Sequence, residues 1–158
     1  MVRHVKLHPL EMNNVDKLSS IHISEKQNRY VRFCLKTIPY EISSNPWAFS
    51  IDVTDTCVGY LYAEQDNDLG LHIHKLVISE EIQRQGIGTA ALHEFTSLAR
   101  IAGIQTIFLS VAYANTGAAQ FYKRFGFIHS ALGVAEAGCN LFSLSLEYHT
   151  LLLQLQYV

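Results

Sequence analysis

The stretch KLVISEEIQRQGIG, residues 75–88, decides how the fold of this 158-residue chain is interpreted. The β-branched run inside it predicts a buried strand over residues 71–79. A polar turn follows, and Gly86 and Gly88 then open a helix predicted over residues 86–102. A strand, a glycine-containing turn and a helix together place several backbone N–H groups at the positive end of a helix dipole. The stretch therefore predicts an anion site, in which the two glycines let a phosphate approach closely.

The predicted helix has an apolar stripe at near-helical spacing. Its members are Ile87, Ala90, Ala91, His93 or Glu94, Phe95, Leu98 and Ile101. The glycines do not match the motifs of two common nucleotide sites. A dinucleotide-binding motif requires a third glycine at the position of Ala91. A P-loop requires a Gly-Lys-Ser/Thr sequence, which the stretch lacks.

The hexapeptide QRQGIG, residues 83–88, resembles the Gln/Arg-x-x-Gly-x-Gly/Ala signature of the GNAT superfamily of N-acetyltransferases. The resemblance implies that this loop holds the pyrophosphate of acetyl-CoA and that the preceding strand binds the pantetheine arm like an added strand. The residues expected to bind acetyl-CoA are Val77, Ile78, Gln83, Arg84, Gln85, Gly86, Ile87, Gly88, Thr89 and Asn115.

A second motif follows a predicted strand over residues 106–111. Asn115 is suited to cap the N-terminus of a helix, and Gly126 is suited to the left-handed position just past its end. The helix ends in FYKRFGF, residues 121–127, which resembles the Phe-Tyr-x-x-x-Gly-Phe motif of the same family. Two motifs in the family's order imply its α/β fold, a mostly antiparallel sheet splayed at the acetyl-CoA site and flanked by helices. We expect one N-acetyltransferase domain over residues 1–158.

Composition is that of a globular protein and argues against several other classes. The chain is 49% hydrophobic and 16% charged, with a net charge of −2 that gives no electrostatic case for nucleic acid. No apolar run approaches the roughly 20 residues that span a bilayer, and the first residues lack the apolar core of a signal peptide. Three widely separated cysteines suggest reduced thiols and a cytoplasmic protein.

The remaining elements follow from periodicity and turn residues. We expect a strand over residues 2–7, a helix from Pro9 to about Ile23, a second helix over 27–35 and a loop over 37–46. Strands over 47–53 and 58–64 form a hairpin, and a turn over 66–70 leads to the central strand. Strands over 127–132 and 141–148 close the fold. The apolar tail, residues 151–158, either packs on its own domain or is covered by a partner subunit.

Tyr122 falls on the family's frequent general acid. A phenol has a reference pKa near 10, so it is protonated at neutral pH and can donate a proton to the departing CoA thiolate. The alternative is that Tyr122 packs as an aromatic side chain beside Phe121 and Phe125.

The base is a separate question, because the central strand carries no glutamate between Leu71 and Ser79. His72 and His74 face the same way, and a neutral imidazole suits a base at physiological pH. The segment HIHKLVI, residues 72–78, resembles the strand of arylalkylamine N-acetyltransferases in which a His-x-His pair relays the amine proton. The alternatives are ordinary strand-face histidines or metal ligands, and no metal site is expected because a further ligand is lacking nearby.

These features predict direct transfer of acetyl from acetyl-CoA to a primary amine. The first hypothesis for the acceptor is the amine of a small molecule. The other hypotheses are a protein or peptide N-acetyltransferase and a non-catalytic acyl-CoA-binding sensor of the same fold. A homodimer is expected by family analogy alone. Candidates for binding a cationic acceptor are Glu25, Glu41, Asp52, Glu64 and Glu80, and candidates for an aromatic pocket are Tyr30, Phe33, Tyr40 and Trp47.

Overall fold

The computed structural model describes residues 4–43, 45–67, 70–130 and 135–147 of the chain. Its strands pair in the order β1-β2-β3-β4-β5-β7-β6. The β4–β5 pair is parallel, whereas β1–β2, β2–β3, β5–β7 and β6–β7 are antiparallel. The predicted mixed α/β class with a mostly antiparallel sheet is therefore confirmed. The predicted splay of that sheet stays a prediction.

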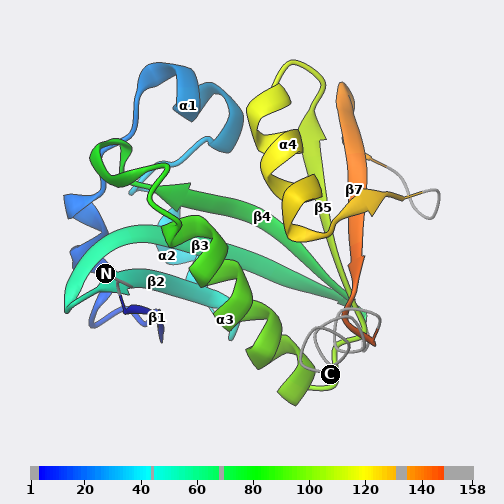
Figure 1. Ribbon diagram of the computed structural model, residues 1–158. Helices are drawn as coiled ribbons and strands as arrows, with labels where there is room; N and C mark the ends of the chain where they lie inside the picture. Colours follow the sequence, from blue (N-terminus) through cyan, green and yellow to red (C-terminus); the bar gives the residue numbers. More distant parts are fainter. Residues whose placement is uncertain (1–3, 44, 68–69, 131–134, 148–158) are drawn as a thin grey trace. The chain divides into compact units, whose positions relative to one another are not determined.

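The chain divides into two compact units, so the single domain expected over residues 1–158 stays a prediction. The first unit comprises Met1–Glu64 and His74–Ser97, and the second comprises Gln65–Ile73 and Leu98–Val158. Strands β3 and β4 and helix α3 each contribute residues to both units. Figure 1 traces these elements along the chain.

The first unit holds the N-terminal strands and the short helices. Its elements, including those shared with the second unit, are β1 (Val5–Pro9), η1 (Val15–Ser20), α1 (Glu25–Val31), α2 (Ile38–Ile42), β2 (Ala48–Val53), β3 (Thr56–Asn67), β4 (Gly70–Ile78), η2 (Glu80–Ile82) and α3 (Ile87–Ile101). The β2–β3 hairpin is confirmed, and its turn residues Thr54 and Asp55 both have positive φ, as a tight hairpin turn requires.

Both faces of the strands in this unit are covered. Phe95 of α3 contacts the rings of Trp47 and Phe49 at centroid distances of 5.9 and 6.2 Å. On the other face, η1 and α2 bury Leu18 and Ile38 against the core cluster that contains Tyr60, Tyr62 and Val77. Each such buried side chain contributes roughly 1.5–3 kcal/mol of hydrophobic stabilisation, so the short helices are held by packing rather than by their own length.

The second unit is built on β5 and β7. Its further elements are β5 (Thr106–Ala112), α4 (Thr116–Phe125), β6 (Ile128–His129) and β7 (Cys139–Ser145). The beginning of β4 pairs with β5 from Gly70↔Thr106 to Ile73↔Leu109, and β7 pairs with β5 along its whole length. Figure 1 shows α4 lying beside β5 and β7, and the burial of Phe127 and Phe142 marks the core of this unit.

Several predicted elements are wrong in type or place. Pro9 ends β1 instead of starting a helix, and the helical stripe that follows forms only the 3-10 helix η1. The loop expected over residues 37–46 contains α2, which has Pro39 in its first turn, where its missing N–H is harmless. Ile101, expected on the apolar stripe of α3, is exposed, whereas Leu92 is fully buried.

Other predictions fall partly outside the described residues. Residues 2–3 of the expected strand 2–7, residues 68–69 of the turn before β4, residues 131–134 of the closing hairpin, residue 148 of the last expected strand and the tail over 151–158 lie outside them. Within the described part, the closing strands are confirmed as β6 and β7, with β7 starting at Cys139, two residues earlier than expected. None of the described helices has the length and apolarity needed to cross a membrane.

An ion pair with little exposure ties α2 to β4. Lys75 Nζ lies 2.6 Å from Glu41 Oε2, and the two side chains are 13% and 12% exposed. Glu41 also accepts hydrogen bonds from the hydroxyls of Tyr60 (3.0 Å) and Thr37 (3.1 Å). Burial, and then the adjacent charge and hydrogen bond of Glu41, raise the pKa of Tyr60 well above its usual value, so the phenol stays a donor.

The substitution Lys75→Met should lower the free energy of unfolding by about 3 kcal/mol, because it leaves the Glu41 carboxylate without its cation. Adding Glu41→Gln should restore part of that loss, since the amide still accepts from Tyr60 and Thr37. Urea unfolding of the two variants measures both effects. Lys36→Met, at an exposed lysine, is the control and should change stability by less than about 0.5 kcal/mol. A double variant no more stable than Lys75→Met would contradict this account.

Candidate active site

The loop after β4 is anchored at its start by hydrogen bonds to two other segments of the first unit. Ser79 is buried, its N–H donates to the carbonyl of Val58 (2.8 Å), and its hydroxyl accepts from the N–H of His22 (3.2 Å). The Glu80 N–H donates to the carbonyl of His22 (2.8 Å). These bonds fix where the chain leaves β4, and the turn η2 (Glu80–Ile82) follows directly.

The Gln83 side chain folds back and closes this loop. Its amide nitrogen donates to the carbonyl of Ile78 and to the side-chain oxygen of Gln27, both at 2.8 Å. The Gln27 amide also donates to Ile78, at 3.4 Å. The side chain of Gln83 is thus used to shape the loop, so any contact that Gln83 makes with a phosphate comes from its backbone.

The exposed end of the loop has the backbone geometry of an anion-binding turn. Arg84 and Gly86 have φ values of +60° and +80°, and the Gly86 carbonyl accepts the first helical bond of α3 from Ala90. Such alternation of ordinary and left-handed residues turns successive N–H groups toward one side. Arg84, Gln85 and Gly86 are all exposed, and the first turn of α3 contains no acidic residue.

Gly86 is needed for a reason that the sequence analysis did not name, and the predicted approach of a phosphate stays a prediction. A Cβ built on it meets no atom within 4 Å, so space within the protein does not demand a glycine. The positive φ does, because L side chains are strained there. The open space above Gly86 is the room that an approaching phosphate would use.

The two predicted strand positions of β4 face opposite edges. A Cβ on Gly59 would lie 2.4 Å from the Val77 carbonyl, so that carbonyl points toward β3. Successive residues of a strand direct their backbone groups to alternate edges, and Ile78 therefore points away from β3. The backbone groups of Ile78, and not those of Val77, therefore point to the edge of β4 away from β3. That is the edge along which the predicted pantetheine arm could bind like an added strand.

Each of the two predicted histidines lies beside a carboxylate of β3. In the first unit, His74 Nε2 is 3.9 Å from Glu64 Oε2, and the His74 ring lies 5.3 Å from the ring of Tyr62. In the second unit, His72 Nδ1 is 3.9 Å from Asp66 Oδ2. The His74 side chain is 33% exposed and that of His72 is 16% exposed. Both histidines therefore lie on the strand with a carboxylate group nearby.

Asn115 and Tyr122 belong to the second unit and lie at the two ends of α4. The Asn115 side chain accepts from the N–H of Ala118 (3.3 Å), so the predicted N-cap is confirmed, and Gly126 has the predicted positive φ, at 124°. The Tyr122 ring packs against Phe121 and Phe127, with centroids 5.1 and 5.5 Å away. Burial raises the pKa of Tyr122, which keeps the phenol protonated.

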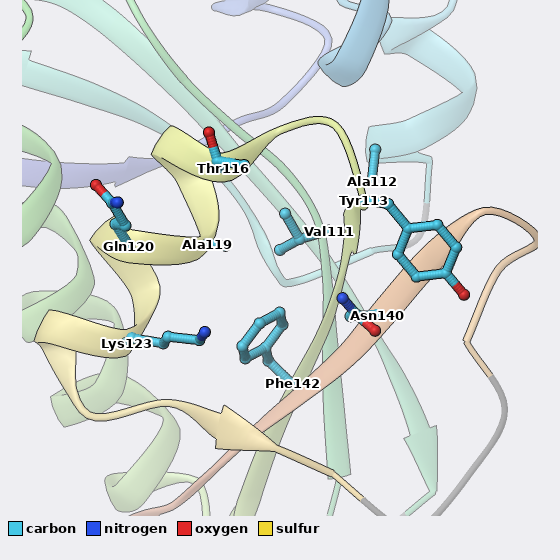
Figure 2. A pocket seen from close by; sticks show the side chains of 9 residues that line it. All are labelled: Val111, Ala112, Tyr113, Thr116, Ala119, Gln120, Lys123, Asn140 and Phe142. Atoms are coloured by element: carbon cyan, nitrogen blue, oxygen red, sulfur yellow. The ribbon is translucent and has the colours of Figure 1, made fainter.

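A shallow groove of about 290 Å³ lies in the second unit between α4 and the ends of β5 and β7 (Figure 2). The Lys123 amine lies over the Phe142 ring, 5.9 Å from its centroid. Asn115 and Tyr122 do not line the groove. The residues that line it are Val111, Ala112, Tyr113, Thr116, Ala119, Gln120, Lys123, Asn140 and Phe142.

The acidic and aromatic candidates for the acceptor site separate by environment. Glu41 and Asp52 are paired with Lys75 and Lys17 at 2.6 and 2.7 Å, and so hold the fold together. Glu25, Glu64 and Glu80 are exposed. Trp47 fills the core, Phe33 packs on Tyr60, Tyr40 is 85% exposed, and Tyr30 is less so. Within the described ranges, no cluster of three or more His, Cys, Asp or Glu side chains could hold a metal ion.

The structure also contains contacts that the sequence analysis missed. These are the Gln27–Gln83 bridge, the Glu41–Lys75 pair and the contacts of Glu64 with Tyr62 and His74. The sequence did contain a signal for the contacts of Glu64. Side chains with polar groups occupy every second position in two series, the first being Tyr60, Tyr62, Glu64 and Asp66 and the second His72 and His74. Across an antiparallel turn, such alternation places the two sets on one face.

The chain belongs to the acetyltransferase (GNAT) family, whose model matches residues 16–127. An uncharacterized N-acetyltransferase of Porphyra purpurea, ycf52, is 32% identical over 83 residues, which cover 52% of this chain and 46% of that protein. The match thus spans about half the length of that relative.

Solved structures of acetyltransferases share the fold. The PaiA N-acetyltransferase of Thermoplasma acidophilum, in complex with coenzyme A, superposes with a TM-score of 0.71 at 15% identity, covering 90% of this chain and 99% of that one. Arabidopsis thaliana Naa50, in complex with the bisubstrate analogue CoA-Ac-MVNAL, gives 0.64 at 21% identity, covering 89% and 98%.

We expect Gly86→Ala to lower the free energy of unfolding by about 1–2 kcal/mol, because alanine is strained at a φ of +80°. It should also weaken acetyl-CoA binding, since the loop would relax away from this geometry. Urea unfolding and calorimetric titration measure the two effects. The matched control is Gly117→Ala in helix α4, where a Cβ added to the glycine would meet no atom within 4 Å. This control should leave the free energy of unfolding unchanged or raise it by about 0.5 kcal/mol. Equal stabilities of the two variants would contradict the strain.

Proposed function

We propose that this protein is an acetyl-CoA-dependent N-acetyltransferase that transfers acetyl directly to a primary amine in a ternary complex. The observation that carries the proposal is the exposed loop from Gln83 to Gly86, with left-handed residues at Arg84 and Gly86, leading into an α3 N-terminus without acidic side chains. Backbone N–H groups in this geometry bind phosphates, and the family to which the chain belongs uses acetyl-CoA.

In this proposal the loop and the first turn of α3 hold the pyrophosphate through the backbone N–H groups of residues 83–89. The positive end of the helix dipole adds to the attraction. Arg84, whose side chain is exposed, supplies a positive charge beside the phosphates. The coenzyme A complex of the T. acidophilum neighbour supports the assignment by fold.

The pantetheine arm would bind along β4 by the backbone of Ile78. Because the Ile78 carbonyl already accepts from Gln83 and Gln27, its N–H is the group we assign to the arm. The Val77 side chain is fully buried in the core cluster, and its packing holds this part of β4 in place. Asn115 caps α4 with its side-chain oxygen, so its amide nitrogen is the group that would donate to the arm.

The chemistry requires two protons to leave the substrate nitrogen and one proton to reach the departing sulfur. A histidine of β4, His72 or His74, takes the first proton, and the neutral amine nitrogen then attacks the thioester carbonyl. As the carbon–sulfur bond breaks, Tyr122 donates its phenolic proton to the sulfur. The second N–H proton then leaves the nitrogen and restores the phenol of Tyr122. Burial raises the pKa of Tyr122, so the phenol is protonated at neutral pH before it donates.

Transfer is direct because neither motif supplies a nucleophile for an acyl-enzyme. The thiol of Cys57 is buried, and its pKa is raised to about 11, chiefly by that burial and secondly by the charge of Asp52. A thiol in this state is almost wholly protonated at neutral pH and is a poor nucleophile.

We place a small-molecule amine first as acceptor and keep the amine of a protein or peptide as the alternative. The alternative is supported by the Arabidopsis neighbour, whose bisubstrate analogue contains the peptide MVNAL. A non-catalytic acyl-CoA sensor is the third reading. It leaves the pairing of His74 with Glu64, and the packing of the Tyr122 ring against Phe121 and Phe127, without a purpose. A homodimer stays part of the proposal by family analogy alone, and a cytoplasmic location stays part of it on the three widely separated cysteines.

Amine-dependent release of free CoA thiol tests the proposed function. We expect release with one chemical class of a panel that holds arylalkylamines, polyamines, amino acids, aminoglycosides and short peptides with free N-termini. Each amine is compared with an amine-free control and with its own N-acetylated form, which has no nucleophile. Release with peptides alone would select the alternative acceptor. No release with any amine, from protein that binds acetyl-CoA, would favour the sensor.

The substitution Tyr122→Phe should lower kcat by about 10²-fold, because it removes the acid, while the Kd for acetyl-CoA changes less than about twofold. Because burial raises the pKa of Tyr122, wild-type kcat should show no loss from phenol ionisation up to pH 10, the ordinary value. Tyr113→Phe, at a tyrosine that is 64% exposed, is the matched control and should be silent. Unchanged turnover in Tyr122→Phe would remove Tyr122 from the acid role.

A further inference from the structure

We propose that Glu64 is a positioning residue that holds His74 as the base, and that Tyr62 in turn holds Glu64. This inference rests on the proposed function and narrows it, since it chooses between the two histidines of β4. The three residues come from two strands of the first unit, β3 and β4, and nothing in the sequence motifs of the chain marks Tyr62 or Glu64.

The two oxygens of Glu64 serve two different neighbours. Oε1 accepts a hydrogen bond from the Tyr62 hydroxyl, and Oε2 lies 3.9 Å from His74 Nε2. The Tyr62 ring also packs against the His74 ring at 5.3 Å, with 31° between the planes. Tyr62 thus contacts both partners, and it is itself fixed, being 8% exposed and stacked on Tyr60 at 6.3 Å.

The distance between Glu64 and His74 suits a catalytic pair before substrate arrives. At 3.9 Å the contact is longer than a hydrogen bond, and it can shorten when the imidazole gains a proton and a positive charge. Contacts of catalytic groups are commonly long without substrate and tighten in the reacting complex. The carboxylate then orients the ring and stabilises the imidazolium, as the carboxylate does in serine-protease triads.

The proton balance of the step is simple. The N–H bond of the substrate ammonium breaks, an N–H bond forms on His74, and the electron pair stays on the amine nitrogen that attacks the acetyl carbon. Glu64 keeps its negative charge throughout and changes no bond. The imidazolium returns its proton to water after acetyl transfer.

The surroundings distinguish His74 from His72. Among the described residues, Glu64 and Tyr62 of β3 are charged or titratable groups that lie beside His74, and the adjacent Lys75 is paired with Glu41 of α2. Because Lys75 is taken up by Glu41, the carboxylate of Glu64 is the acidic group opposed to His74. The His74 side chain is also twice as exposed as that of His72, at 33% against 16%, and a base must be reached by its substrate.

Substitutions of Glu64 and Asp66 form a pair of variants in which one serves as the control for the other. Glu64→Gln and Asp66→Asn each remove one negative charge of similar exposure, 54% and 51%, beside a histidine at 3.9 Å. We expect Glu64→Gln to lower kcat about fivefold to tenfold, the effect of losing a partly exposed charge near 4 Å. The KM values for acetyl-CoA and the amine should change less than twofold.

A double-mutant cycle separates positioning from a merely structural role. In a His74→Gln background, Glu64→Gln should lower kcat by less than twofold, because the residue that it positions is gone. Asp66→Asn should have the same effect in the wild type and in that background. Tyr62→Phe should lower kcat about threefold and add nothing to Glu64→Gln. Thermal unfolding of every variant establishes that each is folded.

Two results would overturn the inference while leaving the proposed function intact. Effects of Glu64→Gln and His74→Gln that simply multiply would show that Glu64 does not act through His74. A rise in the amine KM at constant kcat would show that Glu64 binds the substrate ammonium instead. Wild-type protein that binds acetyl-CoA and acetylates no amine would overturn the proposed function, and this inference with it.

Discussion

Two consecutive residues of β4, His74 and Lys75, reach toward the same face of β3, and the first unit depends on this arrangement. His74 packs against Tyr62, Lys75 bonds Glu41 beside Tyr60, and Tyr60 and Tyr62 stack side by side. The Lys75 side chain secures α2 through Glu41, and the neighbouring His74 side chain stays 33% exposed.

Local chemistry made much of the fold predictable from sequence. The β2–β3 hairpin, the strand–helix unit around Gly86 and the Asn115 and Gly126 caps of α4 each depend on residues close in the chain. α2 was missed because its helical state is not local. Five residues with a proline form no stable helix alone, and α2 exists because Ile38 and Ile42 are buried and Glu41 meets Lys75 from β4. Ile101 was misplaced because the buried face of α3 contains Leu92 beside Ala91 and Phe95, and Ile101, nine residues after Leu92, lies on the opposite side of the helix.

The candidate site was predictable as a set of residues but less so as a set of roles. Sequence spacing indicated Gly86, Asn115 and Tyr122, yet the positive φ of Gly86 and the folding back of the Gln83 side chain onto Ile78 are visible only in the structure. His72 and His74 were equivalent in the sequence, being alternate residues of one strand. In the structure the two side chains differ in exposure, 33% for His74 against 16% for His72, and in the carboxylate beside each, Glu64 for His74 and Asp66 for His72.

The pairing of carboxylates with cations separates structural positions from chemical ones. Glu41 and Asp52 lie in poorly exposed places and are matched with lysines, whose charge is permanent at neutral pH, so these pairs hold α2 and η1 in place. Glu64 and Asp66 are half exposed and face histidines. A carboxylate beside a histidine forms an ion pair only after the imidazole takes up a proton. Such a pair contributes little to the resting fold and gains strength at the moment when a base accepts the proton of an amine, which is the property that the proposed reaction requires of β4.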